Sequence, residues 1–236
     1  AKKTGNLTLV TDAIVHSIIQ DPKTGKATGV KVIDRNSKAG KTYEAKLFFL
    51  NASAIASAQI LLNSRNEANP RGLCNKSDQV GRNLMDHMYA LSTAGILPNG
   101  PDTYYKGRRP TGIYIPRYRN VTEEADGYVR GYGYQGGVMR MGGEPRAGEA
   151  GLGAEMKDKA RKLGPWMAFI SGFGEVLPNP ENRVTENKGQ KDKWGLPIPH
   201  IDVAWGANEA KMAKQILADG KAMIEAAGGM VVSQAS

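Results

Sequence analysis

The sequence predicts a mixed α/β protein, and three features of the residue pattern support that fold class. Short runs of apolar and β-branched residues recur along the chain, as they do in strands. Gly, Pro, Asn and Asp cluster between these runs and predict turns. One longer segment, residues 208–227, repeats its apolar residues with the period of an amphipathic helix.

The composition is that of a globular protein. The 236 residues are enough for one large domain or two modest ones, and 40% of them are apolar. The net charge of +9 is spread along the chain and forms no basic run of roughly five or six residues, which argues against a nucleic-acid partner. Cys74 is the single cysteine, so no disulfide framework is expected. No run approaches the roughly 18 apolar residues of a transmembrane helix.

Residues 7–50 are expected to form a small antiparallel meander that leads into a buried strand. Apolar and β-branched runs predict strands at residues 8–11, 14–19 and 30–33, with turn-forming residues at 21–25 and 36–40. Residues 47–50, Leu-Phe-Phe-Leu, form a continuous apolar run, which is typical of a strand buried on both faces.

Small residues follow that run and open an amphipathic stretch. Ser53 or Ser57 is in position to cap a helix with the apolar residues Ile55, Ile60, Leu61 and Leu62. Small side chains where a strand meets a helix let the backbone approach a flat or phosphorylated ligand closely. We therefore expect a ligand near the turn at Ala52 and Ser53.

The rest of the chain is expected to contain further strands and two helices. Strands joined by long loops are predicted in residues 91–150, and two more at 166–176 and 198–205, flanking a turn-rich segment from 178 to 197. Residues 152–163 predict a short exposed helix, and Gly228-Gly229 ends the long helix. The chain starts without Met and both ends read directly as strand, so we expect a segment of a longer protein.

Residues 131–136, GYGYQG, match the G-x-G-x-x-G pattern of dinucleotide-binding loops. That function needs the glycines between a strand and a helix, and the next residues, GVMRMGGEP, cannot begin a helix. We expect an extended strand instead, with Tyr132 and Tyr134 on one face. We place the two rings on the open face of a sheet, as the wall of a substrate pocket. The alternative is that they pack beneath the helix of residues 208–227.

The other polar residues form no catalytic or metal-binding motif. The three histidines, His16, His87 and His200, lack the spacing of metal ligands. The sequence has no G-x-S-x-G element, no paired-carboxylate pattern and no Cys/His pair. The residues alone therefore predict a ligand-approaching turn but no reaction.

Three blocks, in order along the chain, resemble the glucose–methanol–choline (GMC) family of FAD-dependent oxidoreductases. Residues 50–64, LNASAIASAQILLNS, resemble its strand-to-helix segment, with Ser53 where the family usually has glycine. The next block is matched by GLCN at 72–75 and VGRNLMDH at 80–87, and the substrate-domain signature by LPNPENRVT at 177–185 and DKWGLP at 192–197. RRPTGIYIPR at 108–117 and the Gly-Tyr segment are similar to bacterial sugar dehydrogenases of the family.

The resemblance implies two domains and FAD as cofactor. Residues 1–88 would be the second part of an FAD-binding domain, and residues 89–236 a substrate-binding domain with an antiparallel sheet and a long helix. The residues that the resemblance places near the cofactor are Val15, Ala52, Ser53, Asp86 and His87, with Val15 at the adenine end. For His87 we favour the alternative that it orders a loop through hydrogen bonds with Asp86.

The resemblance also implies a function, the oxidation of CH–OH groups of sugars or other alcohols by hydride transfer to flavin, with the electron acceptor left open. Side chains suited to a sugar-binding wall are Tyr114, Arg117, Tyr132, Tyr134 and Trp166. The family's glycine-rich phosphate loop would precede Ala1 and its catalytic histidine would follow Ser236, so the chain alone is expected to be inactive. Two alternatives stay open: a non-catalytic binding or scaffold module, and one piece of a split flavoenzyme.

Overall fold

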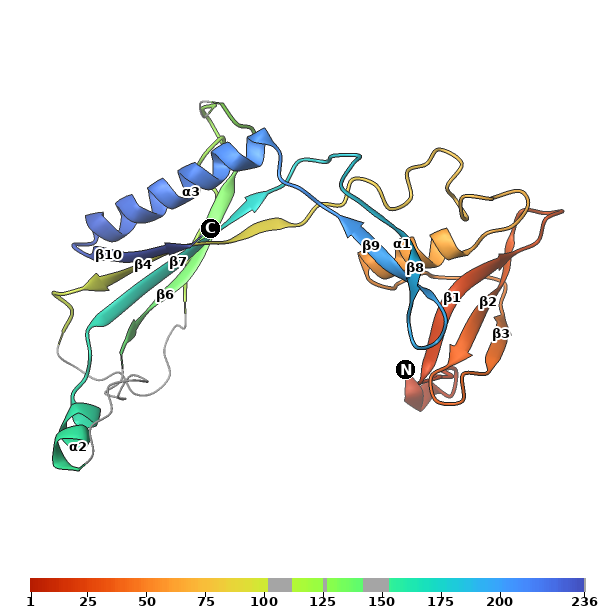
Figure 1. The fold of residues 1–236 in the computed structure, drawn as a ribbon, viewed down its shortest axis with the longest axis horizontal. Coiled ribbons are helices and arrows are strands. Elements are labelled where there is room, and N and C mark those ends of the chain that lie inside the picture. The colour runs from red at the N-terminus through yellow and green to blue at the C-terminus, as the bar shows by residue number, and fades with distance from the viewer. Residues whose placement is uncertain (102–111, 125–126, 142–152, 236) are drawn as a thin grey trace. The chain divides into compact units, whose positions relative to one another are not determined.

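The computed structural model describes residues 1–101, 112–124, 127–141 and 153–235, which form two compact units. The first unit contains Ala1–Met85 and Pro178–Ala204, and the second contains Asp86–Leu177 and Trp205–Ser236 (Figure 1). The chain first passes from one unit to the other between Met85 and Asp86, close to the domain boundary expected at residue 88. Residues 178–204, expected in the second domain, fold with the first unit. The assignment of one part to the cofactor and the other to the substrate stays a prediction.

The first unit is built on a three-stranded antiparallel sheet with the order β1-β2-β3. Its strands are β1 (Ala13–Gln20), β2 (Ala27–Asp34) and β3 (Gly40–Glu44), preceded by a short 3-10 helix, η1 (Lys2–Thr4). Helix α1 (Ala54–Asn63) packs against β1 and against the hairpin of β8 (Arg183–Lys191) and β9 (Pro197–Asp202). The predicted meander is confirmed for residues 14–19 and 30–33, and the helix that follows it is confirmed as well.

Two predicted strands of the first unit are wrong. Residues 8–11 and 47–50 have no regular secondary structure, and the side chains of Leu47 and Phe49 are 70% and 78% exposed. A buried strand needs neighbours that accept its backbone hydrogen bonds and cover both faces. In the described part of the chain no strand pairs with residues 47–50, so the apolar run remains extended and exposed.

A strand was missed in the segment read as turns. β8 contains only one buried apolar residue, Val184, and its remaining side chains are polar, so its sequence lacks a hydrophobic alternation. Its partner β9 returns through a tight turn in which Asp192 Oδ1 accepts from the backbone N–H groups of Trp194 and Leu196. Backbone pairing across a well-capped turn therefore forms this hairpin.

The second unit is a five-stranded antiparallel sheet in the order β10-β4-β7-β6-β5. The strands are β4 (His87–Leu97), β5 (Ile113–Ile115), β6 (Tyr132–Arg140), β7 (Trp166–Glu175) and β10 (Met230–Ala235). Helix α3 (Ala207–Ala226) lies along one face of this sheet (Figure 1), and α2 (Ala154–Arg161) is the short exposed helix that was predicted. The predicted long helix is confirmed to within a residue at either end.

The core of the second unit lies between α3 and the sheet. Met212 and Ile216 of α3 are buried against Met88, Leu91 and Ile170 of the strands. The sheet has glycine where α3 comes closest: a Cβ at Gly172 would lie 2.2 Å from Cγ2 of Ile216. No helix in the described residues is both long enough and apolar enough to span a membrane.

Candidate functional site

The expected extended strand is confirmed, because residues 132–136 of the GYGYQG run form the first part of β6. The rings of Tyr132 and Tyr134 are each 1% exposed and lie beneath α3. The Tyr132 hydroxyl donates to Asp219 Oδ2 at 2.7 Å, and the Tyr134 hydroxyl donates to the Ile216 carbonyl at 2.6 Å. The placement of these rings on the open face is therefore wrong and the alternative is confirmed: a buried phenol needs a hydrogen-bond acceptor, and α3 supplies two.

Asp219 of α3 is the centre of a buried polar cluster, here called the Asp219 cluster. Its carboxylate accepts from five donor groups of four side chains: Tyr118 Oη at 2.6 Å, Arg119 Nε at 3.0 Å and Nη2 at 2.8 Å, Tyr132 Oη at 2.7 Å, and Gln215 Nε2 at 2.7 Å. Burial by itself raises the pKa of Asp219, but the hydrogen bonds, led by those from Arg119, lower the pKa to about 2. The cluster is a satisfied, charged network.

Acid is expected to weaken the second unit by removing the Asp219 charge. The folded-state pKa of about 2 lies below the roughly 3.9 of an unfolded Asp, so the carboxylate's contribution, about 2 kcal/mol, is complete above pH ~4 and is lost as the pH falls towards 2. Thermal unfolding of the 236-residue chain between pH 7 and pH 2 tests this. The gap in Tm between the unaltered chain and Asp219→Asn should close below pH ~4. A constant gap would contradict the prediction.

In the described part of the chain, the face of the sheet opposite α3 carries exposed side chains and is hollowed. Two hollows of about 590 and 260 Å³ share Tyr114, Gln135 and Phe173 in their linings. Strand alternation explains the placement, since Gly172 and Gly174 of β7 meet α3 while the residues between and beside them point the other way. We call this surface the open-face groove and define it by Tyr114, Arg117, Gln135, Phe169, Phe173 and Glu175.

The open-face groove has an aromatic part and a charged part. Tyr114 and Phe169 are exposed in the larger hollow, whereas Arg117, Glu175 and His87 line the smaller one. Arg117 Nη1 lies 3.7 Å from Glu175 Oε2. Aromatic faces beside paired donors and acceptors suit a ligand with both apolar and hydroxylated surfaces.

Three of the five predicted wall residues, Tyr114, Arg117 and Tyr132, line the two hollows. The rings of Tyr132 and Tyr134 nevertheless point away from the groove towards α3, so that Tyr132 borders the smaller hollow without presenting its hydroxyl there. Trp166, at the start of β7, donates its indole N–H to the Pro101 carbonyl instead. Sequence reasoning missed Asp219, although a signal was present. An acid that falls on the apolar stripe of a helix, between Ile216 and Met223, requires buried donors to face it.

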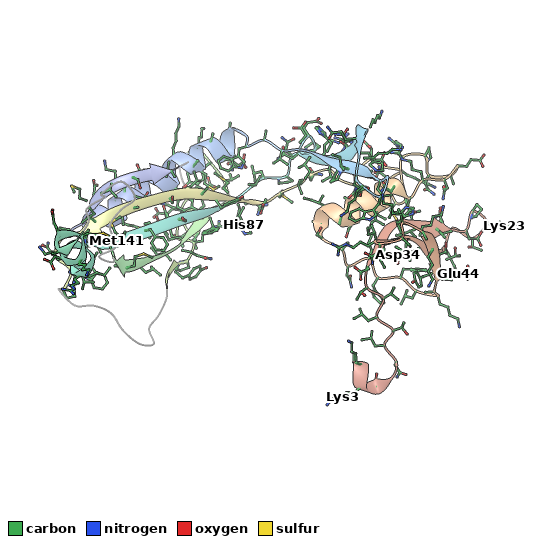
Figure 2. The ribbon with its side chains drawn as sticks, turned by 60° about the horizontal axis from the view of Figure 1, so that its bottom comes forward. Lys3, Lys23, Asp34, Glu44, His87 and Met141 are labelled. Carbon is green, nitrogen blue, oxygen red and sulfur yellow. The ribbon has the colours of Figure 1, made fainter. Side chains whose placement is uncertain are left out.

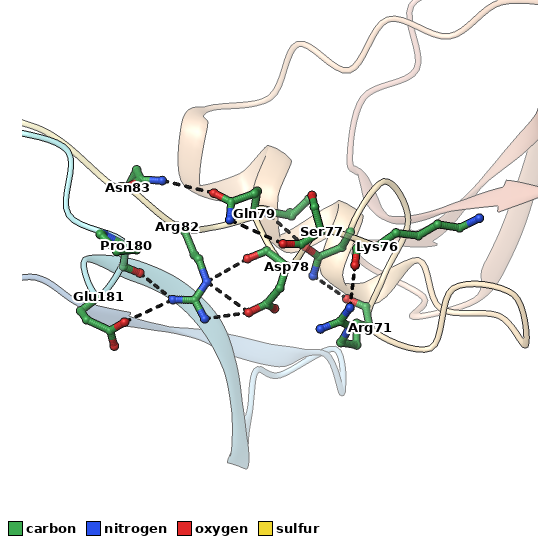
Figure 3. Close-up of polar contacts among 11 residues, drawn as sticks. Arg71, Lys76, Ser77, Asp78, Gln79, Arg82, Asn83, Pro180 and Glu181 are labelled. Carbon is green, nitrogen blue, oxygen red and sulfur yellow. Dashed lines mark hydrogen bonds and ion pairs between the residues drawn. The ribbon is translucent and has the colours of Figure 1, made fainter.

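The block VGRNLMDH belongs partly to each unit. Arg82 donates from Nη2 to Asp78 Oδ2 at 2.7 Å and from Nη1 to the Pro180 carbonyl at 2.9 Å, as Figure 3 shows. Through these contacts Arg82 links the loop around Asp78 to the segment that leads into β8. The role of Arg82 seen in the structure is therefore structural, within the first unit.

Asp86 and His87 lie at the beginning of the second unit, and His87 is the first residue of β4 (Figure 2). Both side chains are exposed, at 79% and 72%. Asp86 Oδ1 accepts from the His87 backbone N–H at 2.7 Å and lies 3.5 Å from His87 Nδ1. This local ordering agrees with the alternative that we favoured, and a flavin contact for either residue stays a prediction.

Comparison with known proteins identifies the family. Residues 1–89 match the profile of the family described as GMC oxidoreductase. The matched residues, 1–89, therefore belong to the GMC oxidoreductase family. The chain is 28% identical over 210 residues to the fructose dehydrogenase large subunit of Gluconobacter japonicus, which covers 87% of this chain and 37% of that protein. It is 30% identical over 218 residues to the 2-methyl-1,2-propanediol dehydrogenase of Mycolicibacterium austroafricanum, covering 88% of this chain and 38% of that protein.

The chain thus spans between 37% and 38% of the length of these curated relatives. GMC oxidoreductases typically bind FAD, and the first unit has features that fit part of such a cofactor. Val15 of β1 is 37% exposed, and Ala52 and Ser53 are exposed at the start of α1. Of the two predicted caps of this helix, Ser53 and Ser57, it is Ser53 that serves, since its Oγ accepts from the Ala56 backbone N–H at 3.2 Å.

The start of α1 carries no acidic residue in its first turn, so nothing there repels an anionic group. The small residues before it leave the backbone accessible. Among the residues that the structure describes, no group of three or more His, Cys, Asp or Glu side chains is arranged to hold a metal ion.

Proposed function

We propose that the whole protein is an FAD-dependent oxidoreductase that oxidises a CH–OH group of a sugar or another alcohol by hydride transfer to flavin. The family and the names of the two relatives support this reaction class. The observation that carries the proposal within this chain is the open-face groove, which sets aromatic rings beside an Arg–Glu pair on the face of the sheet opposite α3. The groove is this chain's contribution to substrate binding.

The side chains of the groove match the surface of a polyhydroxylated substrate. A sugar ring has apolar C–H faces, which stack on aromatic rings such as those of Tyr114 and Phe173. Its hydroxyl groups both donate and accept, so Arg117 would donate to them and Glu175 would accept from them. The groove therefore binds and orients the substrate, which is the task that a protein performs when its cofactor carries the redox chemistry.

The cofactor-facing residues of this chain would be those of the first unit. Val15 offers an exposed apolar side chain for the adenine end, and Ala52 and Ser53 allow a close backbone approach ahead of α1. The backbone N–H groups at the start of α1 would donate to an electronegative part of FAD. When bound, the flavin supplies the acceptor for the hydride. We keep the assignment of residues 1–88 to FAD binding and of 89–236 to substrate binding as part of this proposal.

Arg117→Ala is expected to raise KM for the alcohol substrate about tenfold in the whole enzyme while changing kcat by less than about threefold, because one charge-assisted hydrogen bond to substrate is lost. Steady-state kinetics with a series of sugars and simple alcohols checks this.

Two further variants sharpen the test. Gly131→Ala should act in the same direction, since a Cβ there would lie 2.5 Å from Arg117 Nε and force that side chain to move. Arg161→Ala is the matched control, because Arg161 is an exposed arginine of α2 paired with Asp158. An unchanged KM in Arg117→Ala, with active enzyme, would refute the placement of the substrate in the open-face groove.

A further inference from the structure

Tyr118 and Arg119, which follow Arg117, are both hydrogen-bonded to the carboxylate of Asp219 on α3. Tyr118 Oη and the Nε and Nη2 atoms of Arg119 donate to Asp219 at 2.6 to 3.0 Å. Tyr118 and Arg119 are themselves partly exposed, whereas Asp219 is only 8% exposed. The carboxylate that holds residues 118 and 119 therefore lies between α3 and the sheet, on the face of the sheet opposite the groove.

The orientation of the Arg117 guanidinium depends on the backbone of this anchored segment. Arg117 Nε donates to the Arg119 carbonyl at 3.2 Å, and Nη2 donates to the Asn120 carbonyl at 2.6 Å. Asn120 in turn donates from Nδ2 to the carbonyls of Tyr128 and Arg130. Any change in the path of residues 118–120 would move both acceptors and turn the guanidinium.

The same carboxylate also holds the strand over which Arg117 lies. Tyr132 Oη donates to Asp219 at 2.7 Å, and the neighbours of Tyr132, Gly131 and Gly133, line the smaller hollow. The Arg117 side chain packs closely against Gly131, so the segment that carries Arg117 and the start of β6 are in direct contact. Asp219 is thus bonded to both the segment that carries Arg117 and the strand that supports it.

We propose that Asp219 is a positioning residue for the open-face groove: from the buried face of α3 it holds residues 118–120 and β6 so that Arg117 extends across Gly131 towards Glu175. Asp219 does not line the groove, so its influence on a ligand there passes through Arg117. The proposal rests on the proposed function only for its kinetic consequence, since the coupling of Asp219 to Arg117 exists whatever ligand the groove takes.

The coupling is tested without any substrate by NMR on the 236-residue chain. The Nε–Hε signal of Arg117 is assigned by its disappearance in Arg117→Lys. In Asp219→Asn this signal should shift, and its proton should exchange with water about tenfold faster because the bond to the Arg119 carbonyl is loosened. Ile224→Ala is the control, since it removes buried side chain from α3 next to Gly95 without touching the Asp219 cluster. An unchanged Arg117 signal in Asp219→Asn would overturn the proposal.

The kinetic consequence is tested by a double-mutant cycle in the whole enzyme. Asp219→Asn should raise KM by nearly the factor seen for Arg117→Ala, about tenfold, with little change in kcat. The double variant should be no worse than Arg117→Ala alone, because both changes remove the same contact. Fully additive effects would mean that Asp219 acts by another route and would overturn the positioning role.

A second pair of substitutions keeps the test decisive if Asp219→Asn does not fold. Tyr118→Phe with Arg119→Gln removes the partly exposed donors and leaves Asp219 bonded to Tyr132 and Gln215. The same NMR shift and the same rise in KM are expected, and an unmoved Arg117 signal again overturns the proposal. A changed Arg117 signal in the Asp219 variants, together with an unchanged KM in Arg117→Ala, would support the positioning role and refute the placement of the substrate in the open-face groove.

Discussion

Gly81→Ala is expected to destabilise the first unit by about 4 kcal/mol, through two effects that add at one position. Gly81 has a φ of +85°, which costs any residue with a Cβ about 1 kcal/mol or more. A Cβ there would also lie 2.3 Å from the carbonyl oxygen of Val184. That oxygen cannot retreat easily, because the backbone N–H of Val184 donates to the Gly81 carbonyl at 2.7 Å and its side chain is buried.

Gly25→Ala separates the two effects of the Gly81 substitution. Gly25 has a φ of +71°, but a Cβ there would meet nothing closer than 4.0 Å, so only the backbone strain of about 1 kcal/mol is expected. Urea unfolding can be followed through Trp194, which lies in the first unit, after Trp166 and Trp205 are replaced by Phe. Equal losses in Gly81→Ala and Gly25→Ala would show that the contact with Val184 does not limit the site.

The clearest success of sequence reasoning is α3. Its apolar residues recur with a helical period, and because a helix satisfies its own backbone groups, this pattern needs no distant partner to be read. The same apolar stripe also indicated the Asp219 cluster, since Asp219 follows Ile216 by about one turn on the buried face of the helix. The five donor groups that neutralise the cost of this burial come from α3 itself and from residues 118–132, which no local pattern connects to the helix.

The failures are segments whose structure depends on partners elsewhere. Leu47 and Phe49 have the composition of a buried strand, but burial is a property of the neighbours and not of the run itself. The opposite error is β8, where polar residues form a strand because β9 returns beside them. Antiparallel pairing satisfies backbone hydrogen bonds whatever the side chains are, so hydrophobic pattern alone misses such hairpins.

The two tyrosines show why the alternation of β6 was predictable and its orientation was not. A period of two puts Tyr132 and Tyr134 on one face but does not say which face is covered. Their hydroxyl groups find Asp219 and the Ile216 carbonyl on α3, which decides the orientation in favour of burial. The open-face groove is then lined by the side chain of Gln135 on β6, by the predicted Tyr114 on β5 and by the predicted Arg117, which follows β5.

Gly172→Ala is expected to destabilise the second unit by about 3 kcal/mol, because α3 lies too close to β7 for another methyl group. The new Cβ would be 2.2 Å from Ile216 Cγ2 and 3.3 Å from Ile216 Cβ, and Ile216 is itself 1% exposed among buried neighbours. Either Ile216 leaves its rotamer or α3 moves away from the sheet. Urea unfolding followed through Trp166, with Trp194 and Trp205 replaced by Phe, measures the loss.

A double variant that combines Gly172→Ala with Ile216→Ala distinguishes this clash from a general intolerance of alanine in β7. Ile216→Ala alone leaves a cavity and should cost about 3 kcal/mol. On that background, Gly172→Ala should cost less than about 0.5 kcal/mol, because the added methyl group now occupies space that Ile216 has vacated. Gly40→Ala in β3, where a Cβ would meet nothing within 4 Å, should be nearly neutral. Additive losses in the double variant would contradict this explanation. They would show that β7 itself requires glycine at position 172, whatever the distance to α3.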